Sequence, residues 1–228
     1  MRSDIISFGK AQVFLNYPFD TEFGQLANAM HFAVVASGLI PVCAIDLSSP
    51  DRPRLEMLIE AIINCHYSIH DFSRYTGEGN NNFARFNMPL ETGMALFHAL
   101  QTQRKMHRCA FFVSTPHDYQ SFASDLAGLD PKNYHGDELS LVASVYEWLR
   151  GVGKPLVNEL SIVEVKEKYK QFKSELGRIE GSENNGLPTH DEAQELMYKI
   201  CTKCKWWEWR EYKLGRSEFP PIPLSWKA

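Results

Sequence analysis

Two acidic residues stand where an α/β protein would use them for chemistry. Asp71 ends a short apolar segment with strand character, and Glu91 lies at the start of a segment with helical spacing. In an open parallel sheet, ligands bind beyond the carboxyl ends of the strands, where the N-termini of the following helices also lie. We therefore expect Asp71 and Glu91 to face one crevice.

Glu91 admits two interpretations. A glutamate in the first turn of a helix gains about 0.3–1 kcal/mol from the helix dipole, and acids are common there. The other interpretation is a carboxylate that attacks or stabilises the anomeric carbon of a sugar while the bond from sugar to base breaks. The dipole alone leaves the neighbouring Asp71, Arg74 and polar loop unexplained, so we favour the second interpretation.

Residues around the two acids could bind the rest of a nucleoside. Asp71 could orient a ribose hydroxyl or act as acid and base, while Ser73 and Arg74 could hold a phosphate. The alternative is an Asp-x-Ser turn that only satisfies backbone N–H groups. Asn16, Tyr17 and Phe19 follow the first predicted strand, and either aromatic ring could stack on a base or belong to the core.

The segment at residues 75–86 contains two glycines and three consecutive asparagines. We predict that it forms a lid, which would bring Arg85 and Asn87 onto the ligand. Asn87 could instead cap the helix that follows. Neither of the glycine-rich patterns that cradle phosphates in nucleotide-binding proteins occurs in the chain.

The elements that must position these residues alternate between strand and helix. Apolar runs predict strands at residues 12–16, 39–47, 67–72 and 108–114. Helical spacing predicts helices after Thr21, after Pro53 and at about residues 89–103, with Gly38 ending the first of them. Such alternation predicts a flavodoxin-like (Rossmann-like) α/β fold, with a mostly parallel sheet and helices on both faces.

The second half of the chain has a different pattern. Helical spacing recurs at residues 118–126 and 137–151. Capping boxes at Ser161-x-x-Glu164 and Thr189-x-x-Glu192 predict helices at about residues 162–176 and 190–205. We expect an α/β domain at residues 1–150 and a helical C-terminal extension at residues 151–228.

Composition narrows the class of protein. The chain has 228 residues, of which 44% are hydrophobic and 23% charged, as in globular proteins. A formal net charge of -4 argues against nucleic acid as a partner. Five cysteines, three of them in apolar segments, fit reduced thiols. Since the chain also lacks a signal-peptide pattern and a membrane-length apolar run, we predict a cytoplasmic protein without membrane contact.

The C-terminal region offers weaker signals. Cys201 and Cys204 form a single C-x-x-C without a second pair downstream, so we predict no metal site. Trp206, Trp207 and Trp209 lie among basic residues, which could suggest stacking on nucleic acid. Tryptophan is favoured at protein interfaces, so we expect a packed helix, a homo-oligomer contact or a protein partner instead.

Three motifs carry a family resemblance over about residues 10–115: NYPFD at 16–20, SIHDFSR at 68–74 and RFNMPLETG at 85–93. With them, the chain resembles a bacterial group related to nucleoside 2-deoxyribosyltransferases and, more distantly, to TIR domains. The resemblance implies a flavodoxin-like sheet, a Glu-x-Gly-x-Ala helix start in which Glu91 is the nucleophile, and an assisting Asp71.

The resemblance also implies a reaction. This is cleavage or transfer of the N-glycosidic bond of a nucleoside, a nucleotide or NAD, with NAD as a substrate and no bound cofactor. TIR-like relatives act on NAD, and several take part in antiphage defence. A non-catalytic nucleotide sensor that acts through a protein partner is the alternative, and a purely structural module is the third hypothesis.

Overall fold

The computed structural model describes residues 12–47, 51–74, 87–116, 118–121, 123–126, 128–152, 160–179 and 188–201. The chain divides into two compact units. The first comprises Met1–Gly24 and Pro41–Asp137, and the second comprises residues 25–40 and 138–228. The expected domain boundary near residue 150 stays a prediction.

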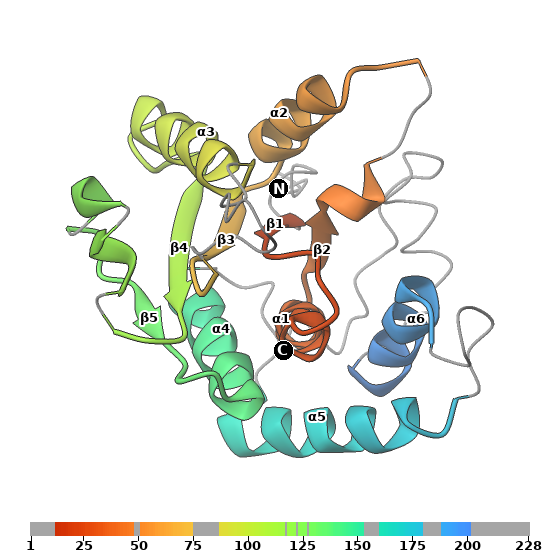
Figure 1. The fold of residues 1–228 in the computed structure, drawn as a ribbon. Coiled ribbons are helices and arrows are strands. Elements are labelled where there is room, and N and C mark those ends of the chain that lie inside the picture. The colour runs from red at the N-terminus through yellow and green to blue at the C-terminus, as the bar shows by residue number, and fades with distance from the viewer. Residues whose placement is uncertain are drawn as a thin grey trace, which may run out of the picture. The chain divides into compact units, whose positions relative to one another are not determined.

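A five-stranded parallel sheet forms the centre of the first unit (Figure 1). Its strands are β1 (Gln12–Asn16), β2 (Ile40–Cys43), β3 (Tyr67–Asp71), β4 (Arg108–Val113) and β5 (Lys132–Asn133). Their order in the sheet is β2-β1-β3-β4-β5. This is the flavodoxin-like order, whose topological switch point lies between β1 and β3. The predicted parallel α/β class is confirmed.

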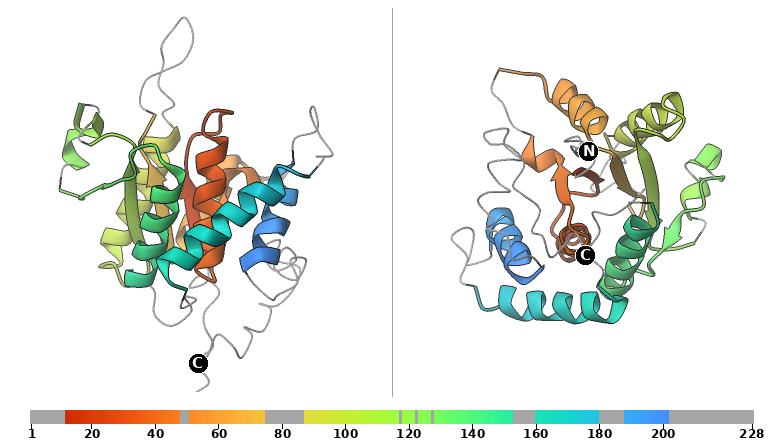
Figure 2. Two further views of the ribbon diagram at one scale, coloured as in Figure 1. Left: turned by 90° about the horizontal axis from the view of Figure 1, so that it is seen from below. Right: turned by 180° about the vertical axis from the view of Figure 1, so that it is seen from behind.

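Two helices of the first unit lie side by side on one face of this sheet (Figures 1 and 2). They are α2 (Arg54–Asn64) and α3 (Asn87–Gln101). Leu58 and Ile62 of α2 and Ala95 of α3 pack with Phe14 and Val42 of the strands in one buried cluster. Because helices of a parallel α/β protein cover the sheet, its strands are buried nearly throughout, as β1 and β2 are here.

Some predicted elements differ from the structure. The strand predicted at residues 39–47 stops at Cys43, because the Asp46 carboxylate accepts a hydrogen bond from the Cys43 N–H at 2.8 Å and turns the chain into a 3-10 helix (Ala44–Asp46). The helix predicted at 118–126 is two short 3-10 helices, Asp118–Ser121 and Ser124–Leu126. Ser and Asp, which are frequent in this segment, are weak helix formers. The two-residue β5 was not predicted, since two residues show no periodicity.

Helices make up the described part of the second unit. They are α1 (Gly24–Ala36), which enters this unit at Gln25, α4 (Glu138–Val152), α5 (Ile162–Leu176) and α6 (His190–Cys201). α5 packs against both α4 and α6 (Figures 1 and 2). Phe32 of α1 meets the rings of Tyr169 and Phe172 at centroid distances of 5.2 and 5.5 Å.

The predicted helix ends of this unit are well supported. Gly38 follows α1 with a φ of 75°, and the N–H of Leu39 donates to the Val34 carbonyl at 3.1 Å, as in a Schellman motif. α5 begins directly after Ser161, and α6 begins directly after Thr189. Both predicted capping boxes are confirmed.

Ser161→Ala is expected to lower the free energy of unfolding by about 1 kcal/mol. The Ser161 hydroxyl accepts the N–H of Glu164 at 3.2 Å, and alanine leaves that donor without its cap. Urea denaturation followed by circular dichroism measures the change. Ser174→Ala, at an exposed site inside the same helix, is the matched control and should be neutral or slightly stabilising. Equal loss in both variants would contradict a capping role for Ser161.

None of the helices in the described residues combines the length and apolar character needed to cross a membrane.

Candidate functional site

The start of α3 is fastened to the carboxyl ends of β1 and β3. The Asn16 amide nitrogen donates to the Met88 carbonyl at 2.9 Å and lies 3.1 Å from Nδ1 of His70. The Thr92 hydroxyl lies at the same distance, 3.1 Å, from that His70 nitrogen. These contacts place the first two turns of α3 at the switch point between β1 and β3, where flavodoxin-like proteins bind ligands.

Glu91 lies in this anchored part of α3. Its side chain is almost buried, with 6% of the residue exposed, and no described residue gives it a hydrogen bond or an ion pair. Burial raises the pKa of Glu91 to about 7, and the positive charge of Arg54 opposes that rise. A nearly buried carboxylate without a hydrogen bond or an ion pair is costly to the fold and marks a candidate functional residue.

The helix-dipole interpretation of Glu91 is wrong in its geometry. α3 begins at Asn87, so Glu91 lies in the second turn, and the first turn holds no acidic residue. Pro89 is compatible with the first turn of α3. Proline lacks a backbone N–H, and the N–H groups of a first turn have no acceptor within the helix in any case. The Thr92 hydroxyl donates to the Met88 carbonyl at 2.8 Å within that turn.

Asp71 ends β3 and is fully buried. Its Oδ1 accepts the backbone N–H of Ser73 at 2.8 Å and also the Ser73 hydroxyl. Its Oδ2 has no hydrogen-bond partner among the residues that the structure describes. Burial raises the pKa of Asp71 to about 6, while Ser73, Tyr134 and Arg74 favour the charged form. The predicted Asp-x-Ser turn is present, and it leaves one carboxylate oxygen unused.

Tyr134 joins this group, although no motif or spacing in the sequence singles it out. It directly follows β5, and its backbone N–H donates to the Val113 carbonyl at 3.1 Å. The residue is fully buried, and its hydroxyl interacts electrostatically with Asp71 and Ser73. That hydroxyl has no hydrogen bond of full geometry with any described residue. Tyr134 and Asp71 therefore interact with each other inside the first unit.

The two predicted stacking residues differ in their surroundings. Tyr17 is 3% exposed and stacks on Phe23, with ring centroids 5.7 Å apart. Phe19 lies against Tyr17 at 4.7 Å and is 37% exposed. Tyr17 thus belongs to the core, and Phe19 is the ring that a base could reach.

The predicted phosphate ligands already have protein partners. Ser73 donates to Asp71, and Arg74 pairs with Glu22 and lies 3.5 Å from Asp20. A phosphate would have to compete with these two acids for Arg74. Asn87 is exposed as the first residue of α3. Arg85 and the predicted lid at 75–86 lie outside the described residues, as does the aromatic tail.

The site residues form two groups at the carboxyl edge of the sheet. Asn16 and Glu91 belong to the α3 side, whereas Asp71, Ser73 and Arg74 form a second group. Successive residues of a strand point to opposite faces. His70 contacts α3, so Asp71 leaves β3 on the other face. That both acids face one crevice stays a prediction.

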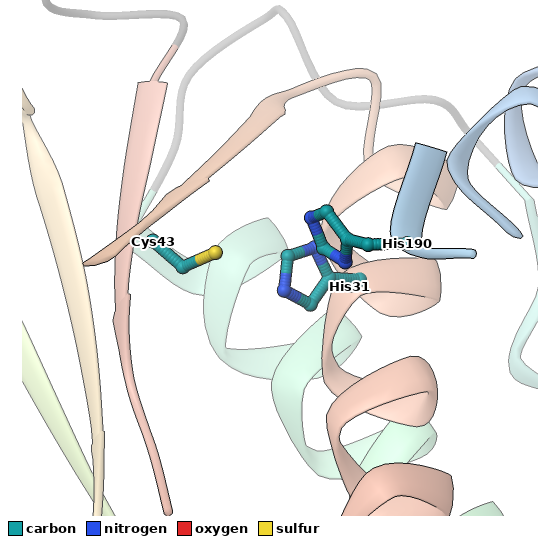
Figure 3. A group of neighbouring side chains, drawn as sticks. All are labelled: His31, Cys43 and His190. Atoms are coloured by element: carbon teal, nitrogen blue, oxygen red, sulfur yellow. The ribbon is translucent and has the colours of Figure 1, made fainter. Parts of the chain in front are cut away.

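A histidine pair lies in the second unit. The rings of His31 in α1 and His190 in α6 meet edge to face at 5.0 Å (Figure 3). The Gln194 amide nitrogen lies 2.8 Å from Nε2 of His190 and 3.4 Å from Nδ1 of His31. Cys43, also drawn there, belongs to the first unit. Catalytic zinc sites use three protein ligands, so we assign no metal to the two histidines of this unit.

A scan of the chain against protein-family models and a search of curated proteins found no match. The candidate site therefore rests on its residues and their geometry.

Proposed function

We propose that the first unit cleaves or transfers the N-glycosidic bond of a nucleoside, a nucleotide or NAD, with Glu91 as the catalytic carboxylate. One observation carries this proposal: Glu91 is a nearly buried carboxylate without a hydrogen bond or an ion pair to any described residue, on the helix anchored at the β1/β3 switch point. Its raised pKa, about 7, suits a group that must change protonation or bonding near neutral pH.

The chemistry follows from the position of a carboxylate beside the anomeric carbon. As the C1′–N bond breaks, its electron pair leaves with the base. A nucleobase then takes up a proton, whereas nicotinamide leaves NAD as a neutral ring and needs none. A Glu91 oxygen bonds to C1′ or stabilises the positive charge that develops there. Water then releases the sugar, or a second base accepts it. Asp71, with a pKa of about 6, is the acid–base partner or the ligand of a sugar hydroxyl.

Other residues would bind the substrate around this centre. Phe19 offers the exposed ring for the base, and Arg74 offers the cation for a phosphate. Asn16 supports α3 through Met88, so we assign it to the architecture of the site.

Incubation of the full chain with NAD, nucleotides and deoxynucleosides, followed by chromatography for free base, tests the proposal. Release of nicotinamide or a nucleobase would support it and identify the substrate. If no compound yields free base but one of them raises the melting temperature of the protein, the non-catalytic sensor is favoured. Inclusion of a second free base separates transfer from hydrolysis, because only transfer yields a new nucleoside.

We expect kcat/KM to rise with pH and to level off above about pH 7. Glu91 must be ionised to attack, and its pKa in the folded protein is about 7. Below that value the ionised fraction falls about tenfold per pH unit. Initial rates at low substrate concentration, measured from pH 5 to pH 9, give the profile. A rate that instead falls through pH 7 would make Glu91 a general acid.

A further inference from the structure

A chain of buried hydrogen bonds runs along β3, away from the candidate site. The Asn16 amide nitrogen is 3.1 Å from His70 Nδ1, and His70 Nε2 is 2.8 Å from the Ser68 hydroxyl. The Ser68 hydroxyl is also 2.8 Å from Nε2 of His107, and Nδ1 of His107 is 2.7 Å from the Cys65 carbonyl. Ser68, His70 and His107 are fully buried, and Asn16 is nearly so. We call this set the His70 chain.

The carbonyl at its far end sets the direction of every bond in the His70 chain. A carbonyl only accepts, so Nδ1 of His107 carries its hydrogen. Burial lowers the pKa of His107 to about 4 and that of His70 to about 3, so both rings are neutral near pH 7. Nε2 of His107 therefore accepts the Ser68 hydroxyl, which in turn accepts Nε2–H of His70. His70 is thus left with Nδ1 as an acceptor.

That acceptor faces the start of α3. The Asn16 amide donates to it and to the Met88 carbonyl, and the Thr92 hydroxyl lies within 3.1 Å of it. If His70 carried its hydrogen on Nδ1, that N–H would face the Asn16 amide, which is also a donor. Asn16 would then lose its hydrogen bond to His70. The tautomer of His70 thus determines how Asn16 holds the turn that contains Glu91.

We propose that the His70 chain is a positioning device, in which Ser68 and His70 fix the Glu91 carboxylate by holding α3 on β1 and β3. Its kinetic consequence rests on the proposed function of Glu91, whereas its effect on tautomer and helix order does not. Ser68 lies inside β3 and is linked to the start of α3 through His70, so it separates positioning from direct contact with a substrate.

Ser68→Ala is the principal test. With His70 Nε2–H left without an acceptor, His70 should move to the Nδ1–H tautomer in part or in full. We expect kcat to fall about 10- to 100-fold, as for a displaced catalytic group, with KM changed less than about twofold. Ser37→Ala is the matched control, since Ser37 is also fully buried and its hydroxyl donates to a local backbone group, the Ala33 carbonyl of α1, at 2.8 Å. It should leave kcat unchanged.

Spectroscopy tests the role of the His70 chain without an enzymatic assay. Nitrogen-15 NMR of the histidine rings should assign hydrogen to Nε2 of His70 and Nδ1 of His107 in the unsubstituted chain. Ser68→Ala should change the His70 pattern and speed amide exchange in the first turns of α3. Thr92→Val, which keeps the side-chain shape but removes the hydroxyl, should also speed that exchange and serves if Ser68→Ala does not fold.

Two results would overturn the inference. One is an unchanged His70 tautomer and unchanged exchange in α3 after Ser68→Ala. The other is a loss of global stability in which kcat and KM both keep their values. If Glu91→Gln retained full turnover, the proposed function would fail, yet the tautomer and exchange measurements would still decide whether the His70 chain holds α3.

Discussion

Glu91→Gln is expected to reduce the release of free base by on the order of 10⁴-fold, the loss typical of removing a catalytic group that bonds to the substrate. Glutamine keeps the size of the side chain but can neither attack C1′ nor balance the charge that develops there. Binding should survive, because Glu91 is buried within α3 and contributes no charge to a phosphate site. Chromatographic rates and the ligand-induced rise in melting temperature give the two quantities separately.

Glu56→Gln is the matched control for this substitution. Glu56 is an exposed glutamate of the neighbouring α2, so the same chemical change there should leave the rate within about twofold. Full activity of Glu91→Gln would refute the catalytic assignment. Equal losses in both variants would point to a general effect on the unit.

The same substitution is expected to stabilise the fold at alkaline pH. The pKa of Glu91 rises from 4.5 to about 7 on folding, chiefly through burial. The folded chain therefore holds this proton more tightly than the unfolded chain, and the resulting stability is present below pH 4.5 and lost as pH rises through 7. A shift of this size corresponds to about 3 kcal/mol at pH 8.

Glutamine carries no charge at any pH, so it removes that cost. Glu91→Gln should raise the free energy of unfolding by about 3 kcal/mol at pH 8 and by almost nothing at pH 4. Urea denaturation at both pH values measures the difference, and Glu56→Gln should show no comparable dependence. A Glu91→Gln chain less stable than its parent at pH 8 would mean that a partner stabilises the charged form.

Local signals in the sequence were sufficient for most of the fold. The capping boxes at Ser161 and Thr189 predict the starts of α5 and α6 because their hydrogen bonds span only three residues. Gly38 predicts the end of α1 for a similarly local reason. β2 was predicted too long, since the bond from Cys43 to Asp46 that ends it leaves no trace in apolar periodicity.

The candidate site was predicted less completely. Glu91 and Asp71 could be chosen from residue type and position along predicted elements, but their burial and partners depend on the packing of distant segments. Tyr134 lies 63 positions after Asp71, next to a two-residue strand, and nothing local marks it. His70 has the same difficulty, because its partner Asn16, and His107, which it reaches through Ser68, come near it only by the pairing of three strands.

The discontinuous second unit bears on how the protein is made. Residues 25–40 belong to it, but its other segments begin only at residue 138. A ribosome therefore delivers every segment of the first unit before α5, whose rings contact Phe32, exists. Until then α1, apolar over most of its length, lacks its packing partners in its own unit. A fragment ending near residue 150 would be locked in that state, with α1 prone to aggregation.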